Sequence, residues 1–193
     1  MDEILNFWFD YEHEKAPIYN RKIWWVKDQK VDNILREKFG LLREKAIKGE
    51  LDDCLELPKG TLAYIILIDQ FSRNLFRDTP KMFEYDALAL SAAKRALKQG
   101  LDKTLTLTER VFMYLPLEHS ENMNDQNESV ALFEQLLNET PEQYKSIAAL
   151  FLNYARDHRL IIEKFQRFPH RNKTLSREST SAEIEFLASH PGY

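Results

Sequence analysis

The polar residues best suited to chemistry begin where the most apolar stretch of the chain ends. Residues 62–68 are apolar without interruption, and the polar side chains that follow are Asp69, Gln70, Arg73, Asn74 and Arg77. On a helix, Asp69 and Arg73 share a face because they are four residues apart. A charge at the end of a buried helix needs a partner or a ligand, because an unpaired buried charge is costly. Two interpretations stay open: an Asp69–Arg73 pair that joins helices, or one side of a ligand site.

A second group of polar residues lies at 116–126, around the segment Pro-Leu-Glu-His-Ser-Glu. Its members are Glu118, His119, Glu121, Asp125 and Gln126. On one continuous helix Glu118, Glu121 and Asp125 would share a face, and residues 111–144 contain no lysine or arginine. Such a face is repulsive unless cations meet it, so the pattern indicates either a solvated acidic face or an acidic wall with a basic partner. His119 beside these carboxylates could act as a general base with a raised pKa.

A basic segment near the C-terminus could supply that partner. Residues 156–177 contain seven lysines and arginines and two acids. Within this segment His158 lies on the apolar stripe of a predicted helix, which is typical of a core histidine, while a ligand contact stays open. The loop that follows carries His170, Arg171 and Asn172. An arginine fork beside an asparagine amide suits the recognition of a carboxylate or a phosphate.

No metal centre or cofactor is predicted. Suitable ligand types are present, namely Glu118, His119, Glu121, His158 and His170, but neither H-E-x-x-H nor the E-x-x-H of di-iron bundles occurs. The sequence also contains no glycine-rich phosphate loop and no G-x-S-x-G motif. Cys54, the only cysteine, follows two acids, which would raise the pKa of its thiol and reduce its reactivity. Catalysis, if present, would therefore depend on His119 or His170, with Glu118.

The composition of the whole chain argues against several classes of protein. Its 193 residues carry a net charge of −4, and 44% of them are hydrophobic, an ordinary balance for a folded domain. The negative charge disfavours nucleic acid as a partner. No apolar run approaches the roughly 18 residues of a membrane span, and the single cysteine fits a reducing compartment. We therefore expect a cytoplasmic protein without a membrane partner.

The elements that must position these side chains are all predicted to be helices. Apolar residues recur with the 3.6-residue period of an amphipathic helix, and no segment alternates like a strand. Local signals predict capping boxes at 106–109 and 180–183, a helix start at 79–80, a stop at Gly100 and a kink or division at Pro116. Short connections imply antiparallel neighbours. Residues 1–193 are therefore predicted to form one all-α domain, a superhelix or bundle of about seven to eight helices.

The three polar groups coincide with motifs of a known family. The relevant stretches are LNFWF near the start, GELDD at 49–53, LIDQFSRNLFRDT at 67–79, ERVFMYLPLEHSENMNDQ at 109–126 and FQRFPHRNKTLSREST at 165–180. Together they resemble the bacterial family catalogued as domain of unknown function 924. The resemblance implies a tetratricopeptide-like helical superhelix and no assigned activity. Ser72 stands where the family pattern has a proline, and Asp78, Gln166 and Ser176 stand where it has glycines, so these differences affect turns.

Three functions stay open at this stage. In the first, the chain binds a small anionic molecule or a peptide carboxylate, clamped by arginines and oriented by asparagines. The residues concerned are Arg73, Arg77, Arg171, Asn74 and Asn172. In the second, it is a hydrolytic enzyme with His119 or His170 as general base and arginines that stabilise a developing anion. In the third, it is a scaffold for a protein partner, and the polar groups are internal ion pairs.

Overall fold

The regular structure of the chain is helical throughout residues 1–190, which the computed structural model describes. The α-helices are α1 (Asp2–Phe9), α2 (Gln29–Ile47), α3 (Pro58–Ile65), α4 (Phe71–Leu75), α5 (Asp86–Gln99), α6 (Leu107–Glu118), α7 (Met123–Glu139), α8 (Lys145–Phe165) and α9 (Ser181–Ser189). A π-helical turn, η3 (Ile66–Gln70), joins α3 to α4, so these two form one continuous helix. The prediction of an all-α superhelix or bundle is confirmed. The tetratricopeptide-like arrangement and the single domain stay predictions.

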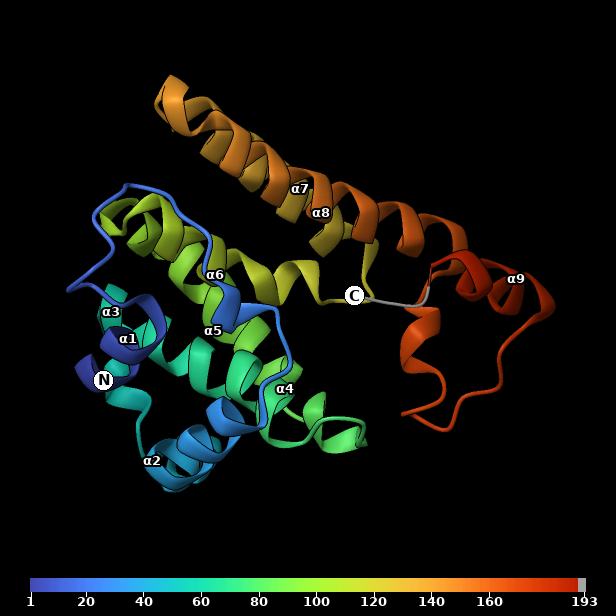
Figure 1. The fold of residues 1–193 in the computed structure, drawn as a ribbon, viewed down its shortest axis with the longest axis horizontal. Helices are drawn as coiled ribbons and strands as arrows, with labels where there is room; N and C mark the ends of the chain where they lie inside the picture. Colours follow the sequence, from blue (N-terminus) through green and yellow to red (C-terminus); the bar gives the residue numbers. More distant parts are fainter. Residues whose placement is uncertain (191–193) are drawn as a thin grey trace.

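The helices divide into a body and a long hairpin (Figure 1). Helices α1 to α6 form the body, and the paired helices α7 and α8 run along one side of it. The contacts of this hairpin with the body are made chiefly through α6. The chain then continues past α8 through a short 3₁₀ turn, η7 (Pro169–Arg171), to α9. None of the helices in this described part is long and apolar enough to cross a membrane.

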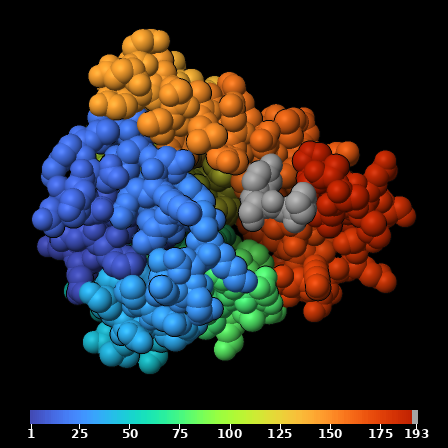
Figure 2. Space-filling model, in the orientation of Figure 1, coloured from blue at the N-terminus to red at the C-terminus, as the bar shows by residue number. Residues whose placement is uncertain are grey.

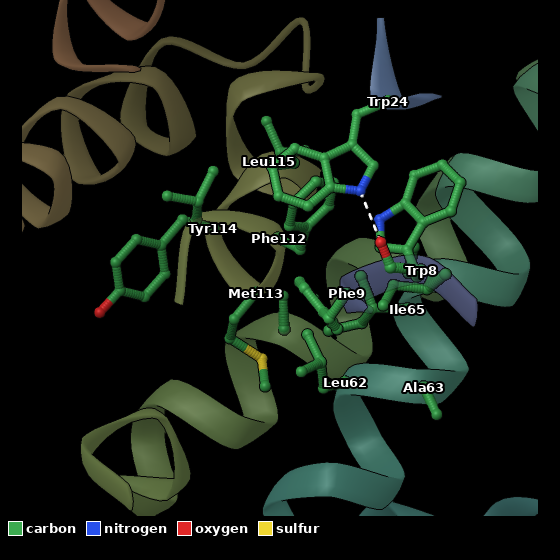
Figure 3. Packing of buried hydrophobic residues seen from close by; sticks show 14 of the residues in the cluster. Trp8, Phe9, Trp24, Leu62, Ala63, Ile65, Phe112, Met113, Tyr114 and Leu115 are labelled. Carbon is green, nitrogen blue, oxygen red and sulfur yellow. Dashed lines mark hydrogen bonds between the residues drawn. The ribbon is translucent and has the colours of Figure 1, made fainter. Parts of the chain in front are cut away.

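The continuous helix formed by α3, η3 and α4 lies in the core. Residues 60–72 are all buried, as the uninterrupted apolar character of residues 62–68 predicts. Aromatic side chains from α1 and from the loop after it pack against this helix and α6, and Figure 3 shows the Trp24 indole nitrogen donating to the Trp8 carbonyl oxygen at 2.9 Å. Trp8 makes edge-to-face contacts with Phe71 and Phe112. The aromatic N-terminal region therefore covers the core, although Trp25 is 49% exposed.

The local signals at helix ends have mixed outcomes. Both predicted capping boxes form, at Thr106 and at Thr180, and Gly100 ends α5 with a φ of 69°. Of the kink or division expected at Pro116, the division is wrong, because Pro116 lies inside α6, which ends only two residues later. A proline that close to the end leaves little helix to redirect.

The expected helix start at 79–80 is also wrong in part. Pro80 begins a short 3₁₀ turn, η4 (Pro80–Met82), and α5 starts only at Asp86. The hydroxyl of Thr79 donates to the Phe76 carbonyl oxygen and so does not cap a helix. Residues 76–85 consequently form an irregular loop at the end of the buried helix, and this loop becomes one wall of the site.

The turns that differ from the family pattern have unusual backbone angles. Asp78, Gln166 and Ser176 have φ values of 61°, 58° and 53°. This is the left-handed region, which glycine occupies with less steric cost than other residues. The positions where the resemblance implies glycine are therefore positions where the backbone favours it.

Candidate functional site

The site begins at the π-helical turn of the buried helix. Such turns occur frequently at functional sites, and here the turn places the carboxylate of Asp69 in a fully buried position. Its Oδ2 atom accepts from Gln70 Nε2 at 2.5 Å, and its Oδ1 atom lies 2.9 Å from Arg73 Nη1. The predicted Asp69–Arg73 pair is therefore confirmed. The same Oδ1 atom lies 2.7 Å from Nδ1 of His119, which is brought in by the C-terminal end of α6.

The protonation of this pair follows from its surroundings. Burial raises the pKa of the Asp69 carboxyl, but the charges of Arg73 and His119 outweigh it and hold that pKa well below its ordinary value. Asp69 is thus an acceptor, and Nδ1 of His119 carries the proton. Burial and the charge of Arg73 lower the pKa of His119 against the opposing effect of Asp69. The expectation of a raised pKa is wrong, because it considered the neighbouring carboxylates and neither burial nor the arginine.

The remaining nitrogen of His119 is available for chemistry. In a neutral imidazole whose Nδ1 carries the proton, Nε2 holds a lone pair. No hydrogen bond of Nε2 is formed within residues 1–190. The side chain is 15% exposed and lies in the wall of a cleft. His119 therefore has the state and the access that a general base needs.

Hydrogen bonds connect the neutral His119 to a ring of ion pairs. Arg73 donates to both oxygens of Asp86, each at 2.9 Å. Asp86 Oδ2 also lies 3.6 Å from Arg171 Nη1, and Arg171 Nη2 donates to the backbone oxygen of His119 at 3.0 Å. The ring thus joins α4, α5, α6 and η7. Asp86 is missed by sequence reasoning, because a single acid at the start of an amphipathic helix carries no signal that distinguishes it from a surface residue.

Arg171 is the least compensated cation of this ring. Its guanidinium lies between the rings of Phe83 and Phe168, 4.6 Å from each centroid. Burial lowers its pKa to about 10, and the charge of Arg73 acts in the same direction. It forms one hydrogen bond, to the His119 carbonyl oxygen, and its buried Nε atom has no partner among the described residues. By contrast, the pKa of Arg73 is raised, because Asp69 and Asp86 outweigh the effect of burial.

The cleft in front of His119 has a volume of about 1100 Å³. Its walls come from the loop at 76–85, the start of α5, the end of α6 and the segment around η7. Figures 1 and 2 show the loop after α4 and the segment after α8 next to each other. Its lining includes His119, Arg171, Phe83, Ala87, Leu90 and Leu175.

A second buried group lies close to His119, whose ring centroid is 6.5 Å from that of His158. The Oε1 atom of Glu118 is 3.3 Å from Nδ1 of His158, which also lies 2.8 Å from the Tyr154 carbonyl oxygen. Burial raises the pKa of Glu118 to about 8 and lowers that of His158 to about 3, so both are neutral at pH 7. Burial, aided by Arg171, lowers the pKa of His170 to about 4. These three residues are not among the described residues that line the cleft, and no group of three or more potential metal ligands occurs there.

Several predicted ligand-binding residues instead hold the scaffold together. Arg77 donates to both oxygens of Asp32 at 2.7 and 3.0 Å, and Asn74 donates to the same carboxylate at 2.9 Å. The Asn172 amide accepts from Arg177 at 2.9 Å and donates to Ser179 at 3.0 Å. Geometry alone therefore separates Asn74, Arg77 and Asn172 from the cleft, because each points to a partner within the protein.

The expected common face of three acids is wrong. Glu118 ends α6, Glu121 lies in the turn after it, and Asp125 lies in α7, because the chain leaves the helix between them. Glu121 forms a two-pronged ion pair with Arg177, so the basic segment does supply one partner. Asp125 pairs with Lys94 and accepts from the hydroxyl of Ser120. Gln126 donates to the carbonyl oxygens of Glu118 and Ser120 and thereby holds this turn in place.

The comparisons with known proteins agree with this helical architecture. A family model described as "Bacterial protein of unknown function (DUF924)" matches residues 4–191, and the chain belongs to this family. A solved structure of a protein of unknown function from Agrobacterium tumefaciens is 34% identical, with a TM-score of 0.81, over 97% of this chain and 96% of that one. The comparison with curated proteins gave no match. Both the family and the solved relative are described as of unknown function.

Proposed function

We propose that this chain is a hydrolytic enzyme in which His119 acts as general base on a small uncharged ester or amide bound in the cleft. One observation carries the proposal. A neutral histidine, oriented by a buried carboxylate at 2.7 Å, holds an unbonded Nε2 atom at the wall of an open cleft beside an arginine. A base in its unprotonated form near pH 7, within reach of a bound substrate, is what general-base catalysis requires.

Each step of the proposed reaction uses a group of the site. Nε2 of His119 takes a proton from a water molecule, and the water oxygen forms a bond to the carbonyl carbon of the substrate. The carbonyl oxygen becomes negatively charged, and Arg171, as the least compensated cation, stabilises this charge. The protonated His119 then gives its proton to the leaving oxygen or nitrogen as that bond breaks. The products are an acid and an alcohol or amine, and Asp69 remains ionised and keeps His119 in one tautomer.

Binding of an anion by three arginines has less support. Arg73 and Arg77 are each held by carboxylates in two-pronged pairs, so an anionic ligand would have to displace these partners. Of these three arginines, Arg171 alone has a buried donor atom without a partner among the described residues. The scaffold hypothesis finds support in the ring of ion pairs, which joins four elements, but the ring leaves the Nε2 side of His119 open.

The proposal is tested by ester hydrolysis with a matched pair of variants. The probe is p-nitrophenyl butanoate, and the variants are His119→Asn and His13→Asn. His13 also lies 2.7 Å from an aspartate, Asp10, but on the exposed surface. We expect the wild type to hydrolyse the ester faster than buffer, His119→Asn to lose about 100-fold of this activity, and His13→Asn to keep it. Equal rates for wild type and His119→Asn would contradict the proposal.

A further inference from the structure

The lining of the cleft is divided into a polar end and an apolar remainder. The polar end consists of the ring members His119, Asp86 and Arg171, with Ser120 and Glu121 directly after His119. Away from it, the side chains that line the cleft are chiefly apolar: Phe76, Pro80, Phe83, Ala87, Leu90 and Leu175. On α5, Leu90 lies one helical turn beyond Asp86, so the surface becomes apolar within one turn of the ring.

The charges around the polar end cancel one another. Asp69 and Asp86 compensate Arg73 and Arg171, and Glu121 is paired with Arg177. The loop at 76–85 adds one lysine and one glutamate to the lining, Lys81 and Glu84, so it adds no net charge either. The lining therefore has no excess charge of one sign that would select a charged ligand, although Lys81 and Glu84 form no ion pair with another described residue.

Arg171 has the donor geometry for a carbonyl oxygen. Its Nη1 atom lies 3.6 Å from Asp86 Oδ2, which is beyond hydrogen-bond distance, and no hydrogen bond of Nη1 is formed within residues 1–190. A neutral carbonyl group can accept from this atom without displacing Asp86. The carbonyl carbon would then lie at the same end of the cleft as Nε2 of His119.

We infer that the apolar part of the cleft binds the alkyl chain of an uncharged carbonyl compound, with the carbonyl group at Arg171 and the chain along Phe83, Ala87 and Leu90. The cavity of about 1100 Å³ has room for such a ligand, since sites for small molecules measure roughly 300–1,000 Å³. The substrate of the proposed enzyme is accordingly a medium-chain acyl ester or amide. This assignment of substrate class rests on the proposed function, whereas binding of the alkyl chain of the ligand does not require His119 to react.

The test uses ligands that cannot be hydrolysed. Binding of 2-hexanone, 2-octanone and 2-decanone to the full chain is measured by calorimetry. Burial of each methylene group is expected to tighten binding roughly fourfold. Ala87→Phe fills the cleft from an exposed position on α5, and Leu88→Phe adds a similar side chain at the next exposed position, which does not line the cleft. Ala87→Phe is expected to weaken binding of 2-decanone about tenfold or more, and Leu88→Phe to leave it within about twofold.

Each outcome decides between alternatives. An affinity that does not rise with chain length, or equal effects of Ala87→Phe and Leu88→Phe, overturns the inference. Tighter binding of nonanoate than of 2-nonanone also overturns it, because the occupant would then be an anion. His119→Asn separates the two proposals: it is expected to bind 2-decanone as the wild type does. If the ketones bind as expected while the ester is not hydrolysed, the binding site for the alkyl chain is supported and the proposed hydrolytic function is contradicted.

Discussion

Nδ1 of His119 lies 2.7 Å from Oδ1 of Asp69, the same distance that separates His13 from Asp10. The two pairs nevertheless differ in their chemistry. At the exposed pair, the hydrogen bond to Asp10 raises the pKa of His13. At the buried pair, burial and Arg73 lower the pKa of His119. A histidine–aspartate contact therefore marks a candidate base only together with its surroundings.

Removal of the buried carboxylate is expected to affect both activity and stability. In Asp69→Asn the amide no longer fixes the tautomer of His119, and Arg73 loses one of its two anionic partners. We expect ester hydrolysis to fall about 100-fold or more and the free energy of unfolding to fall by about 3 kcal/mol, measured by urea titration at pH 7. Asp10→Asn removes the partner of the exposed His13 and is expected to leave ester hydrolysis unchanged and to lower the free energy of unfolding much less than Asp69→Asn does, because solvent screens exposed charges. A similar loss in both variants would show that burial of the pair does not matter.

The buried histidines predict that the protein loses stability in mild acid. The folded-state pKa values of His158, about 3, and His170, about 4, lie below the ordinary value of 6.5, and that of His119 is also lowered. At a pH between each folded-state pKa and 6.5, the unfolded chain binds more protons than the native state does. The free energy of unfolding therefore falls as the pH decreases below about 6.5, by about 1.4 kcal/mol per pH unit for each excess proton. His158→Gln is expected to reduce the slope of the free energy of unfolding against pH by about 1.4 kcal/mol per pH unit, the contribution of one proton. The slope is measured by urea titrations between pH 6.5 and 5. His13→Asn should not reduce it, since the pKa of His13 is raised.

Glu118 predicts a dependence of opposite sign. Its folded-state pKa of about 8 lies above the ordinary value of 4.5, so the native state retains a proton that the unfolded chain releases. The free energy of unfolding contributed by this group therefore falls as the pH rises from about 4.5 to 8. The free energy of unfolding of Glu118→Gln, relative to that of the wild type, is expected to rise by about 1.4 kcal/mol per pH unit across this window. Both proteins are measured by urea titration at pH 5 and 8. Glu121→Gln is the control, because Arg177 holds the pKa of Glu121 below its ordinary value. If the difference in free energy of unfolding between Glu118→Gln and the wild type is the same at pH 5 and at pH 8, then Glu118 is ionised in the native state.

The left-handed turns predict stabilising substitutions. Gln166 ends α8 with a φ of 58°, and Ser176 has a φ of 53°. Gln166→Gly and Ser176→Gly are each expected to raise the free energy of unfolding by about 1 kcal/mol, because glycine adopts this conformation with less steric cost. Gly100→Ala, at a φ of 69° with open space around the new Cβ atom, is expected to lower it by a similar amount. A decrease for both glycine variants would show that the side chains at 166 and 176 stabilise these turns.

The helices could be predicted from the sequence because their signals are local. Apolar periodicity, the capping boxes at Thr106 and Thr180, and the glycine at 100 act over three to four residues. The uninterrupted apolar stretch at 62–68 predicts the buried helix for the same reason, and the charged residues directly after it predict the Asp69–Arg73 pair. Loop 76–85 is less predictable, since Pro80 can begin either a helix or a single turn.

The site itself was decided by contacts between distant segments. His119 meets Asp69 across fifty residues, and Arg171 reaches His119 across fifty-two. Residue types and spacing in the sequence indicate these three residues as candidates, but they indicate Asn74, Arg77 and Asn172 equally, whose partners lie within the scaffold, and they give no signal for Asp86. The direction in which the pKa of His119 shifts likewise depends on burial and on Arg73. Residue types and spacing determine which groups are available and which helix faces they occupy. The packing of those helices determines which charges are paired, which atoms are desolvated and which side chains line a cleft, because electrostatic and solvation energies depend on distances through space.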